Sequence, residues 1–217
     1  EENKPALEKY EKLIRPANYE GRLPGKGVVI VETANGELVA VANLIGRVFL
    51  DKDNPNPYKT ADDILKELPS AVKLVFVDFH AEATAEKIAM GWFLDGRVTA
   101  VTGTHTHVAT ADERVLPKGT AYITDVGMCG PHHSVIGRKV ENVLKLLAEG
   151  QPTALNVADG DVRMNGVIVE ADVVTGKAVS IERVCLREPE GSVVSDPDDE
   201  DNPPLNSSDG KVQSAHA

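Results

Sequence analysis

The 217-residue chain has few aromatic residues, few cysteines and no long apolar run. Aromatic residues make up only 4% of the chain, so a hydrophobic core must be built mainly from aliphatic side chains. No apolar run reaches the roughly 18 residues that a membrane-spanning helix needs, so we expect no membrane association. Two cysteines, Cys129 and Cys185, are too few for a disulfide scaffold and are typical of a reducing compartment.

Positive charge is also scarce. The chain has 23 lysines and arginines against 34 aspartates and glutamates, which gives a net charge of −11. Such a balance argues against a protein that binds the phosphate backbone of DNA. The first residues are Glu1, Glu2, Asn3 and Lys4, with no apolar segment typical of a secretory signal. We therefore expect a cytoplasmic protein.

The negative charge is concentrated at the C-terminal end. Residues 188–217 contain eight acidic residues, one lysine and four prolines, with few large apolar side chains. A segment of this composition buries too little apolar surface to offset the entropy lost on ordering. We predict a folded part over residues 1–187 and a disordered acidic tail over residues 188–217.

The N-terminal residues have the pattern of a helix already under way. Leu7, Tyr10, Leu13 and Ile14 share one helical face, and the chain does not begin with methionine. This start is typical of a fragment or of a processed protein.

Hydrophobic periodicity predicts a layered α/β domain. Asn35-Gly36 indicates a hairpin between two strands, since both residues tolerate positive φ. Thr60 is the expected cap of a helix over 61–69, and the helix over 83–94 should turn Ile88, Ala89, Trp92 and Phe93 inward. The remaining predicted elements are helices over 4–14 and 139–149, and strands over 28–33, 38–43, 72–79, 98–102, 121–126, 154–158, 162–171 and 178–186.

Three histidines follow predicted buried strands. His80 follows the strand over 72–79, and His105 and His107 follow the strand over 98–102, within the string GTHTH at 103–107. Ligand sites of α/β sheets collect at the carboxyl ends of the strands. In extended backbone the two histidines of a His-x-His string lie on the same side, so they could serve one metal ion or two neighbouring ions.

Other chemical roles stay open from the residues alone. Cys129 with a nearby histidine could form a nucleophilic pair, although a Gly-Pro loop with an incidental cysteine is simpler. Asp78 or Asp125 could complete a site for one metal with two histidines, and Asp125 could instead support a histidine or cap a turn. Glu82 either supports a histidine or lies in the first turn of the following helix, and the helix explanation is the simpler.

The longer strings resemble the YmdB-like metallophosphoesterases of the calcineurin-like superfamily. They are DFHAEATAEK at 78–87, GTHTHV at 103–108 and GTAYITDVGM at 119–128, with RPAN at 15–18 and NLIGR at 43–47. The resemblance implies two β-sheets flanked by helices and a two-metal site, with manganese or iron as the metals. It also implies hydrolysis of phosphodiesters such as 2′,3′-cyclic nucleotides, with His80 and His105 on one ion and His107 on the other.

The chain lacks the strings of the family's N-terminal part. That part supplies a bridging aspartate, further metal ligands and the proton-donating histidine, so the catalytic residue is unknown here. We therefore expect a calcineurin-like sandwich without its N-terminal strands, a fragment inactive by itself. Its exposed sheet edges would allow homo-oligomers. The alternative is a non-catalytic binding or regulatory module derived from the same fold.

Overall fold

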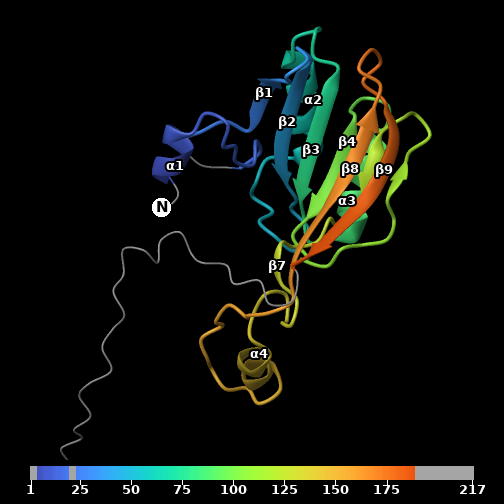
Figure 1. Cartoon of the computed structure of the whole chain (residues 1–217). Helices are drawn as coiled ribbons and strands as arrows, with labels where there is room; N and C mark the ends of the chain where they lie inside the picture. The colour runs from blue at the N-terminus through green and yellow to red at the C-terminus, as the bar shows by residue number, and fades with distance from the viewer. Residues whose placement is uncertain (1–3, 20–22, 189–217) are drawn as a thin grey trace, which may run out of the picture. The chain divides into compact units, whose positions relative to one another are not determined.

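The computed structural model describes residues 4–19 and 23–188, so the predicted acidic tail lies outside the described residues except for Glu188. Helices and strands alternate along the chain (Figure 1). The helices are α1 (Lys4–Lys9), α2 (Pro57–Glu67), α3 (Thr84–Leu94) and α4 (Val140–Leu147). The strands are β1 (Val28–Glu32), β2 (Leu38–Ile45), β3 (Leu74–His80), β4 (Ala100–Thr104), β5 (Arg114–Val115), β6 (Ala121–Ile123), β7 (Gly130–Pro131), β8 (Val162–Ala171) and β9 (Ala178–Arg187).

A six-stranded sheet forms the centre of the fold, in the order β1-β2-β3-β4-β6-β5. Strands β2, β3, β4 and β6 are parallel, so their carboxyl ends meet at one edge. The predicted hairpin is confirmed, because β1 pairs antiparallel with β2 and Gly36 adopts a φ of 91° in the turn. Strands β1 and β5 lie at the two edges of this sheet.

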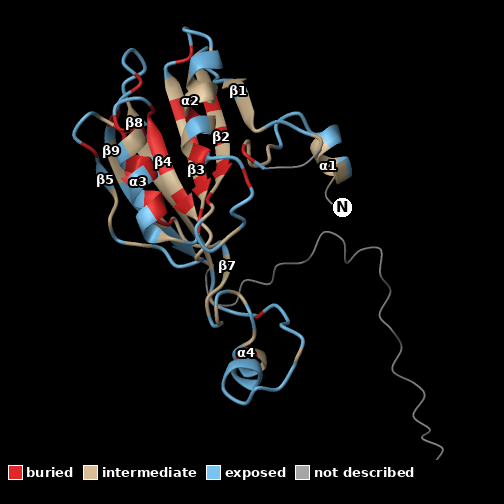
Figure 2. Ribbon diagram, turned by 180° about the vertical axis from the view of Figure 1, so that it is seen from behind, coloured by how far each residue is buried: buried red, intermediate tan, exposed pale blue. Residues whose placement is uncertain are grey.

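The two faces of this sheet are covered differently. Val75, Val77 and Phe79 alternate along β3 and pack in the main core with Met90 and Leu94 of α3. Phe76 points to the opposite face, where the smaller sheet β7-β8-β9 covers it through side chains such as Val169 and Ile181. Figure 2 shows the buried residues concentrated along β2, β3 and β4. The predicted architecture of two sheets flanked by helices is confirmed.

Helix α2 begins earlier than the sequence predicts. Its cap is Asn56, whose side-chain oxygen accepts hydrogen bonds from the N–H groups of Tyr58 and Lys59. Pro57 then occupies the first turn, where its missing N–H costs nothing. The prediction of Thr60 as the cap was wrong, because the Asn-Pro pair supplies a stronger start signal four residues upstream.

Helix α3 turns inward a face that matches the predicted one only in part, since Phe93 packs against the main core but Ile88 and Trp92 do not. Trp92 is 51% exposed and Ile88 is 37% exposed, whereas Glu86 and Lys87 are buried. The two charged residues tolerate burial because each has a partner: Glu86 accepts from the N–H of Arg47, and Lys87 donates to Asp125. Hydrophobicity alone therefore misplaces the buried face of this helix.

Several boundaries also shift. The predicted strand over 154–158 is wrong, since only an isolated bridge joins Val157 to Arg138 in that stretch. The short strands β5 and β7 were not predicted, because two residues carry no periodic pattern. Helix α1 ends at Lys9, five residues before its predicted end. None of the helices within 4–19 and 23–188 is long and apolar enough to cross a membrane.

Candidate metal centre

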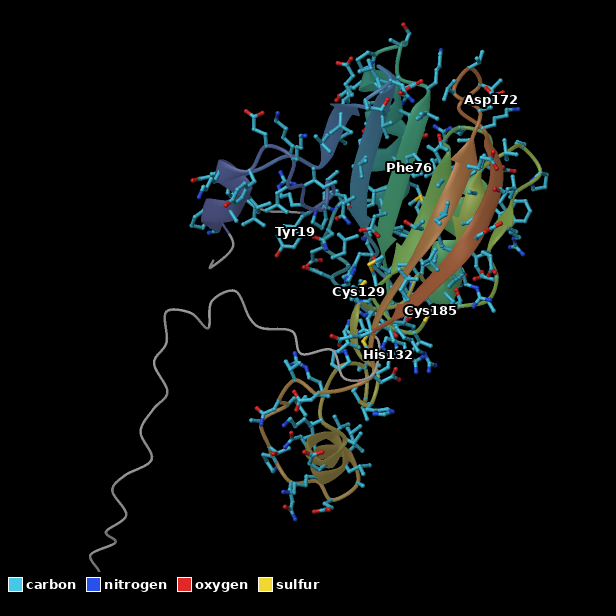
Figure 3. The ribbon with its side chains drawn as sticks, in the orientation of Figure 1. Tyr19, Phe76, Cys129, His132, Asp172 and Cys185 are labelled. Carbon is cyan, nitrogen blue, oxygen red and sulfur yellow. The ribbon has the colours of Figure 1, made fainter. Side chains whose placement is uncertain are left out.

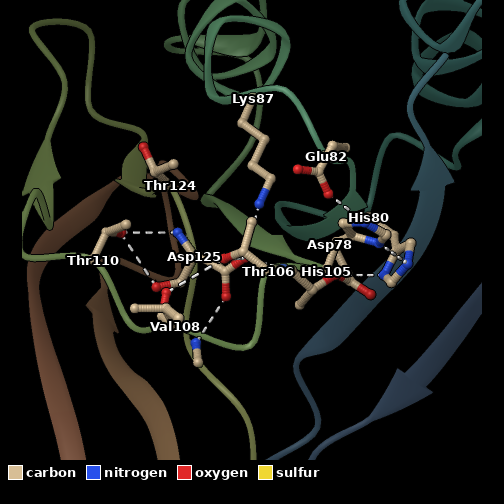
Figure 4. A network of polar contacts seen from close by, with 12 residues as sticks. Asp78, His80, Glu82, Lys87, His105, Thr106, Val108, Thr110, Thr124 and Asp125 are labelled. Carbon is tan, nitrogen blue, oxygen red and sulfur yellow. Dashed lines mark hydrogen bonds and ion pairs between the residues drawn. The ribbon is translucent and has the colours of Figure 1, made fainter. Parts of the chain in front are cut away.

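The carboxyl edge of the central sheet brings two of the three predicted histidines together. His80 is the last residue of β3 and pairs in register with Thr104, the last residue of β4. His105 follows Thr104 directly, so both imidazoles project from neighbouring strand ends (Figure 4). Their ring centroids are 4.8 Å apart and the ring planes are nearly perpendicular, at 88°. The prediction that these strand ends meet is correct for this pair.

Hydrogen bonds on the far side of the ring orient His80. Its Nδ1 lies 3.2 Å from the Thr104 hydroxyl, which donates to Oδ1 of Asp78 at 2.9 Å. The amide of Asn43 holds the other oxygen of Asp78 at 2.6 Å. Since the Thr104 proton is given to Asp78, the hydroxyl accepts from His80 Nδ1–H. The lone pair of His80 therefore lies on Nε2.

Glu82 orients His105 in the same way. Its Oε2 lies 2.6 Å from Nε2 of His105, which places the ring proton on that nitrogen and the lone pair on Nδ1. His105 Nδ1 in turn lies 3.0 Å from His80 Nε2. Two facing lone pairs repel at this distance, so the pair is stable with a shared proton between the nitrogens or with a cation bound by both.

The separation of the two nitrogens fits a metal ion. Imidazole nitrogens bound to one ion at about 2.0–2.1 Å, in tetrahedral or octahedral geometry, lie roughly 3.0–3.4 Å apart. The observed 3.0 Å between His80 Nε2 and His105 Nδ1 falls in this range. The donor pair therefore fits a divalent ion, with Asp78 and Glu82 fixing the rings as outer carboxylates commonly do. We call His80, His105 and Glu82 the histidine cluster.

His107 occupies a different place from the one the extended string predicts. The backbone is not extended there: His105 has a φ of 110° and His107 a φ of 67°. The Nδ1 of His107 lies 3.0 Å from the carbonyl oxygen of Ile136, to which it donates, so its Nε2 carries the lone pair. Within the described residues, no hydrogen bond or ring contact joins His107 to the histidine cluster. Left-handed backbone at non-glycine residues is strained and is typical of functional sites.

A buried ion pair holds the loop between the two positive-φ histidines. Lys87 Nζ donates to Asp125 Oδ2 at 2.8 Å, and both side chains are 1% exposed. Asp125 Oδ2 also accepts from the N–H and the hydroxyl of Thr106, at 3.0 and 2.7 Å, and Oδ1 accepts from Gly127 N–H at 2.9 Å. We call Lys87, Thr106, Asp125 and Gly127 the Asp125 network. It fixes the residue between His105 and His107.

The electrostatics of the two carboxylates differ. Burial raises the pKa of Asp78 above its ordinary value, despite hydrogen bonds from Thr104 and Asn43. Burial alone would also raise the pKa of Asp125, but hydrogen bonds from Lys87 and Thr106 outweigh it, so that pKa is lowered. Burial and the neighbouring His105 lower the pKa of His80, which favours the neutral imidazole that a metal requires.

The residues present make an incomplete metal site. In the part of the chain that the structure describes, no group of three or more His, Cys, Asp and Glu side chains has a metal-holding arrangement. Asp78 is engaged by Thr104 and Asn43, and Asp125 by the Asp125 network. These contacts disfavour the single-metal alternative that uses either carboxylate.

Sequence reasoning missed two supporting residues and preferred the wrong one of two roles for a third. Glu82 precedes α3 and contacts His105, so its assignment to the first helical turn was wrong. Lys87 and Thr104 were not singled out, because a lysine inside a helix and a threonine in a strand carry no distinctive signal. The nucleophile hypothesis for Cys129 gains no support, since its thiol lies 3.5 Å from the carbonyl oxygen of Asn165, to which it donates.

Comparison with known proteins identifies the family. The profile of the YmdB-like protein family matches residues 1–184. The chain belongs to this family. It is 48% identical over 176 residues to a Bacillus subtilis protein named 2′,3′-cyclic-nucleotide 2′-phosphodiesterase, a match that covers 81% of this chain and 66% of that protein. The chain thus spans slightly less than two thirds of that relative's length.

Two solved structures share the fold of this YmdB-like chain. One is a hypothetical protein from Thermus thermophilus, with a TM-score of 0.78 and 41% identity, covering 85% of this chain and 71% of that one. The other is described as a novel phosphatase from Mycoplasma pneumoniae, with a TM-score of 0.78 and 36% identity, covering 86% and 68%.

Proposed function

We propose that this chain supplies part of the active site of a metal-dependent phosphodiesterase that hydrolyses 2′,3′-cyclic nucleotides or related small phosphodiesters. The observation that carries the proposal is the convergence of His80 Nε2 and His105 Nδ1, 3.0 Å apart, at the carboxyl edge of the sheet. The name of the Bacillus subtilis relative supports the substrate class.

Two divalent ions, manganese or iron, are the proposed cofactors, with His80 and His105 on one ion and His107 on the other. Such a pair supplies a Lewis acid for the phosphate oxygens and an activated water as nucleophile. The chain's own contribution is to hold neutral imidazoles in fixed orientations, through Thr104 for His80, Glu82 for His105 and Ile136 for His107. These contacts keep the lone pairs available without reorganisation.

Three imidazoles bring no negative charge to balance two dications. Structural and catalytic sites also use about three or more protein ligands for each ion. Further donors must therefore come from outside the described residues, and we expect the 217-residue chain to bind metal weakly and to have little activity by itself.

Alanine variants of His80, His105 and His107 in the intact gene product test the proposal. After manganese loading, each variant should hydrolyse 2′,3′-cyclic AMP more slowly by roughly two or more orders of magnitude, because each removes a metal ligand. His133 is exposed, and among the described residues no hydrogen bond, ion pair or ring contact joins it to the histidine cluster, so His133→Ala is the matched control and should keep wild-type turnover.

Metal content distinguishes a metal-dependent phosphodiesterase from a non-catalytic binding or regulatory module. We expect close to two metal ions in the intact protein after loading and desalting, and essentially none in the 217-residue chain. Wild-type turnover in all three histidine variants would overturn the proposal. An intact protein that retains no metal and hydrolyses nothing would instead indicate a binding or regulatory module.

A further inference from the structure

A cavity of about 560 Å³ is lined in part by His107, the proposed ligand of the second ion. Its walls come from His107–Ala109 after β4, from His132 and residues 134–136 after β7, and from the β8–β9 hairpin. Figure 3 shows Cys129, His132 and Cys185 together at the end of the hairpin near β7. Small-molecule sites in proteins occupy about 300–1,000 Å³, so the cavity has the size of a nucleoside site.

Strand alternation explains which hairpin residues face the cavity. Asn165 of β8 pairs directly with Cys185 of β9, so their side chains lie on the same face. Arg163 and Arg183 lie two residues from these positions and share that face. All four line the cavity, whereas Leu186, the next residue of β9, points the other way and is 57% exposed.

The charges of this cavity are balanced. Arg163 forms an ion pair with Asp161, and Arg183 Nε lies 2.9 Å from Glu113 Oε2. Paired guanidinium groups still offer donors and flat faces that stack on bases, but they add little net positive charge. The cavity therefore suits an uncharged aromatic group with polar edges better than a second phosphate.

Two polar side chains of the cavity, Asn165 and His132, are held in place by hydrogen bonds. The Asn165 amide donates to the Met128 carbonyl at 2.8 Å and to His132 Nε2 at 3.1 Å. His132 Nδ1 donates to the Gly130 carbonyl at 3.0 Å, so both ring nitrogens are satisfied within the protein. This imidazole is thus a fixed wall of the cavity and is not available as a metal ligand. Fixed walls reduce the ordering cost of binding.

His107 connects the cavity to the proposed metal centre. The Ile136 carbonyl orients the His107 ring, and the Ile136 side chain lines the cavity together with Val108 and Val135. Ile136 has a φ of 45°, which is strained for a β-branched residue and is typical of functional sites. A ligand whose phosphate lies at His107 would therefore extend its organic part over an apolar surface.

We infer that this cavity is the nucleoside subsite, which binds the base and ribose of a nucleoside 2′,3′-cyclic phosphate while the phosphate lies beside His107. The inference rests on the proposed function. It assigns the choice among nucleotides to the hairpin face of β8 and β9, to His132 and to the loop over 134–136.

The first test is binding of adenosine to the 217-residue chain without metal, followed by amide NMR. Adenosine should bind with a dissociation constant of about 0.1–1 mM and shift the amides of residues 163–167 and 183–185. Cys185→Trp fills the cavity from β9 and should abolish these shifts. Leu186→Trp introduces the same side chain on the opposite face of the strand and should leave them unchanged.

Val135→Trp provides a second cavity-filling variant from the loop wall, in case Cys185→Trp does not fold. Absence of adenosine shifts in wild type overturns the inference whatever the activity. Equal effects of Cys185→Trp and Leu186→Trp, in variants that keep the wild-type circular dichroism spectrum, also overturn it.

Kinetics of the intact gene product separate the two proposals. Cys185→Trp should raise KM for 2′,3′-cyclic AMP by about tenfold or more and leave kcat nearly unchanged, because it blocks binding and spares the reacting atoms. Hydrolysis of methyl p-nitrophenyl phosphate, which lacks a nucleoside, should change by less than about twofold. If wild type hydrolyses neither substrate, the phosphodiesterase proposal fails, whereas saturable adenosine binding would still support the cavity as a nucleoside site.

Discussion

The Asp125 network and the histidine cluster lie at the same sheet edge but are built in opposite ways. In the Asp125 network both charges are 1% exposed, and Asp125 accepts four hydrogen bonds from within the chain. In the histidine cluster His105 is 27% and Glu82 46% exposed, and two ring nitrogens face each other at 3.0 Å. The closed network stabilises the fold, whereas the cluster leaves donor capacity for a ligand.

The largest expected effect concerns the ion pair. Asp125→Ala leaves Lys87 buried without its carboxylate and should lower the free energy of unfolding by about 3–5 kcal/mol. Urea denaturation followed by circular dichroism measures the change. A decrease in the free energy of unfolding below about 1 kcal/mol would mean that the Asp125 network does not stabilise the fold substantially.

Removal of a residue from the histidine cluster should leave the stability of the fold nearly unchanged and weaken metal binding. His105→Ala should change the free energy of unfolding by less than about 1 kcal/mol, because the ring is partly exposed. The same variant of the intact gene product should bind manganese at least about 100-fold more weakly, as measured by competition with a chelator. Strong destabilisation with unchanged metal affinity would contradict the assignment of metal binding to the histidine cluster and of stability to the Asp125 network.

Acid should act on the two buried carboxylates in opposite directions. The pKa of Asp125 is lowered by folding, so its stabilisation is present above the ordinary value of 3.8 and is lost as the pH falls through the folded pKa. The pKa of Asp78 is raised, so the folded carboxyl takes up a proton first and stability is gained as the pH falls through its folded pKa.

Thermal melts from pH 7 to pH 3 test this difference. The gap in Tm between wild type and Asp125→Asn should narrow in acid, whereas wild type should gain stability relative to Asp78→Asn. Parallel curves for the two variants would contradict the opposed pKa shifts.

The smallest expected effect concerns the link between the two regions. Thr106→Val removes the hydroxyl that donates to Asp125 and keeps the backbone N–H bond, so it should cost about 1 kcal/mol. It should also weaken manganese binding by the intact protein, because the residue lies between His105 and His107. Thr33→Val, which removes an exposed hydroxyl that donates to Glu37 beside the β1–β2 turn, is a control that should leave metal affinity unchanged.

The sequence predicts the parallel centre of the sheet well, since β3 and β4 are short apolar runs that must be buried on both faces. Prediction from the sequence fails where paired polar groups are buried in place of hydrophobic side chains. Helix α3 buries Lys87 in place of Trp92 because Asp125 lies opposite, and that partner is 38 residues away in the chain. No local sequence pattern indicates that Lys87 pairs with Asp125.

The candidate site was predicted in part for a similar reason. Strand ends place His80 and His105 correctly, because register follows from the hydrophobic pattern. The left-handed backbone at His105 and His107 depends on how Asp125 holds Thr106, which a His-x-His spacing does not contain. The role of Glu82 depends on the same left-handed backbone, since Glu82 contacts His105 directly after the end of β4.

We assign His80 Nε2 and His105 Nδ1 as the two nitrogens that the contacts of the histidine cluster leave free to bind a cation. Long-range proton–nitrogen NMR of the histidine side chains in the intact protein tests it directly, with Zn²⁺ as a diamagnetic probe. We expect Zn²⁺ to shift the His80 Nε2 and His105 Nδ1 signals together, while His80 Nδ1 and His105 Nε2 keep their protons. Metal-induced shifts at the opposite nitrogens, or at neither ring, would contradict it.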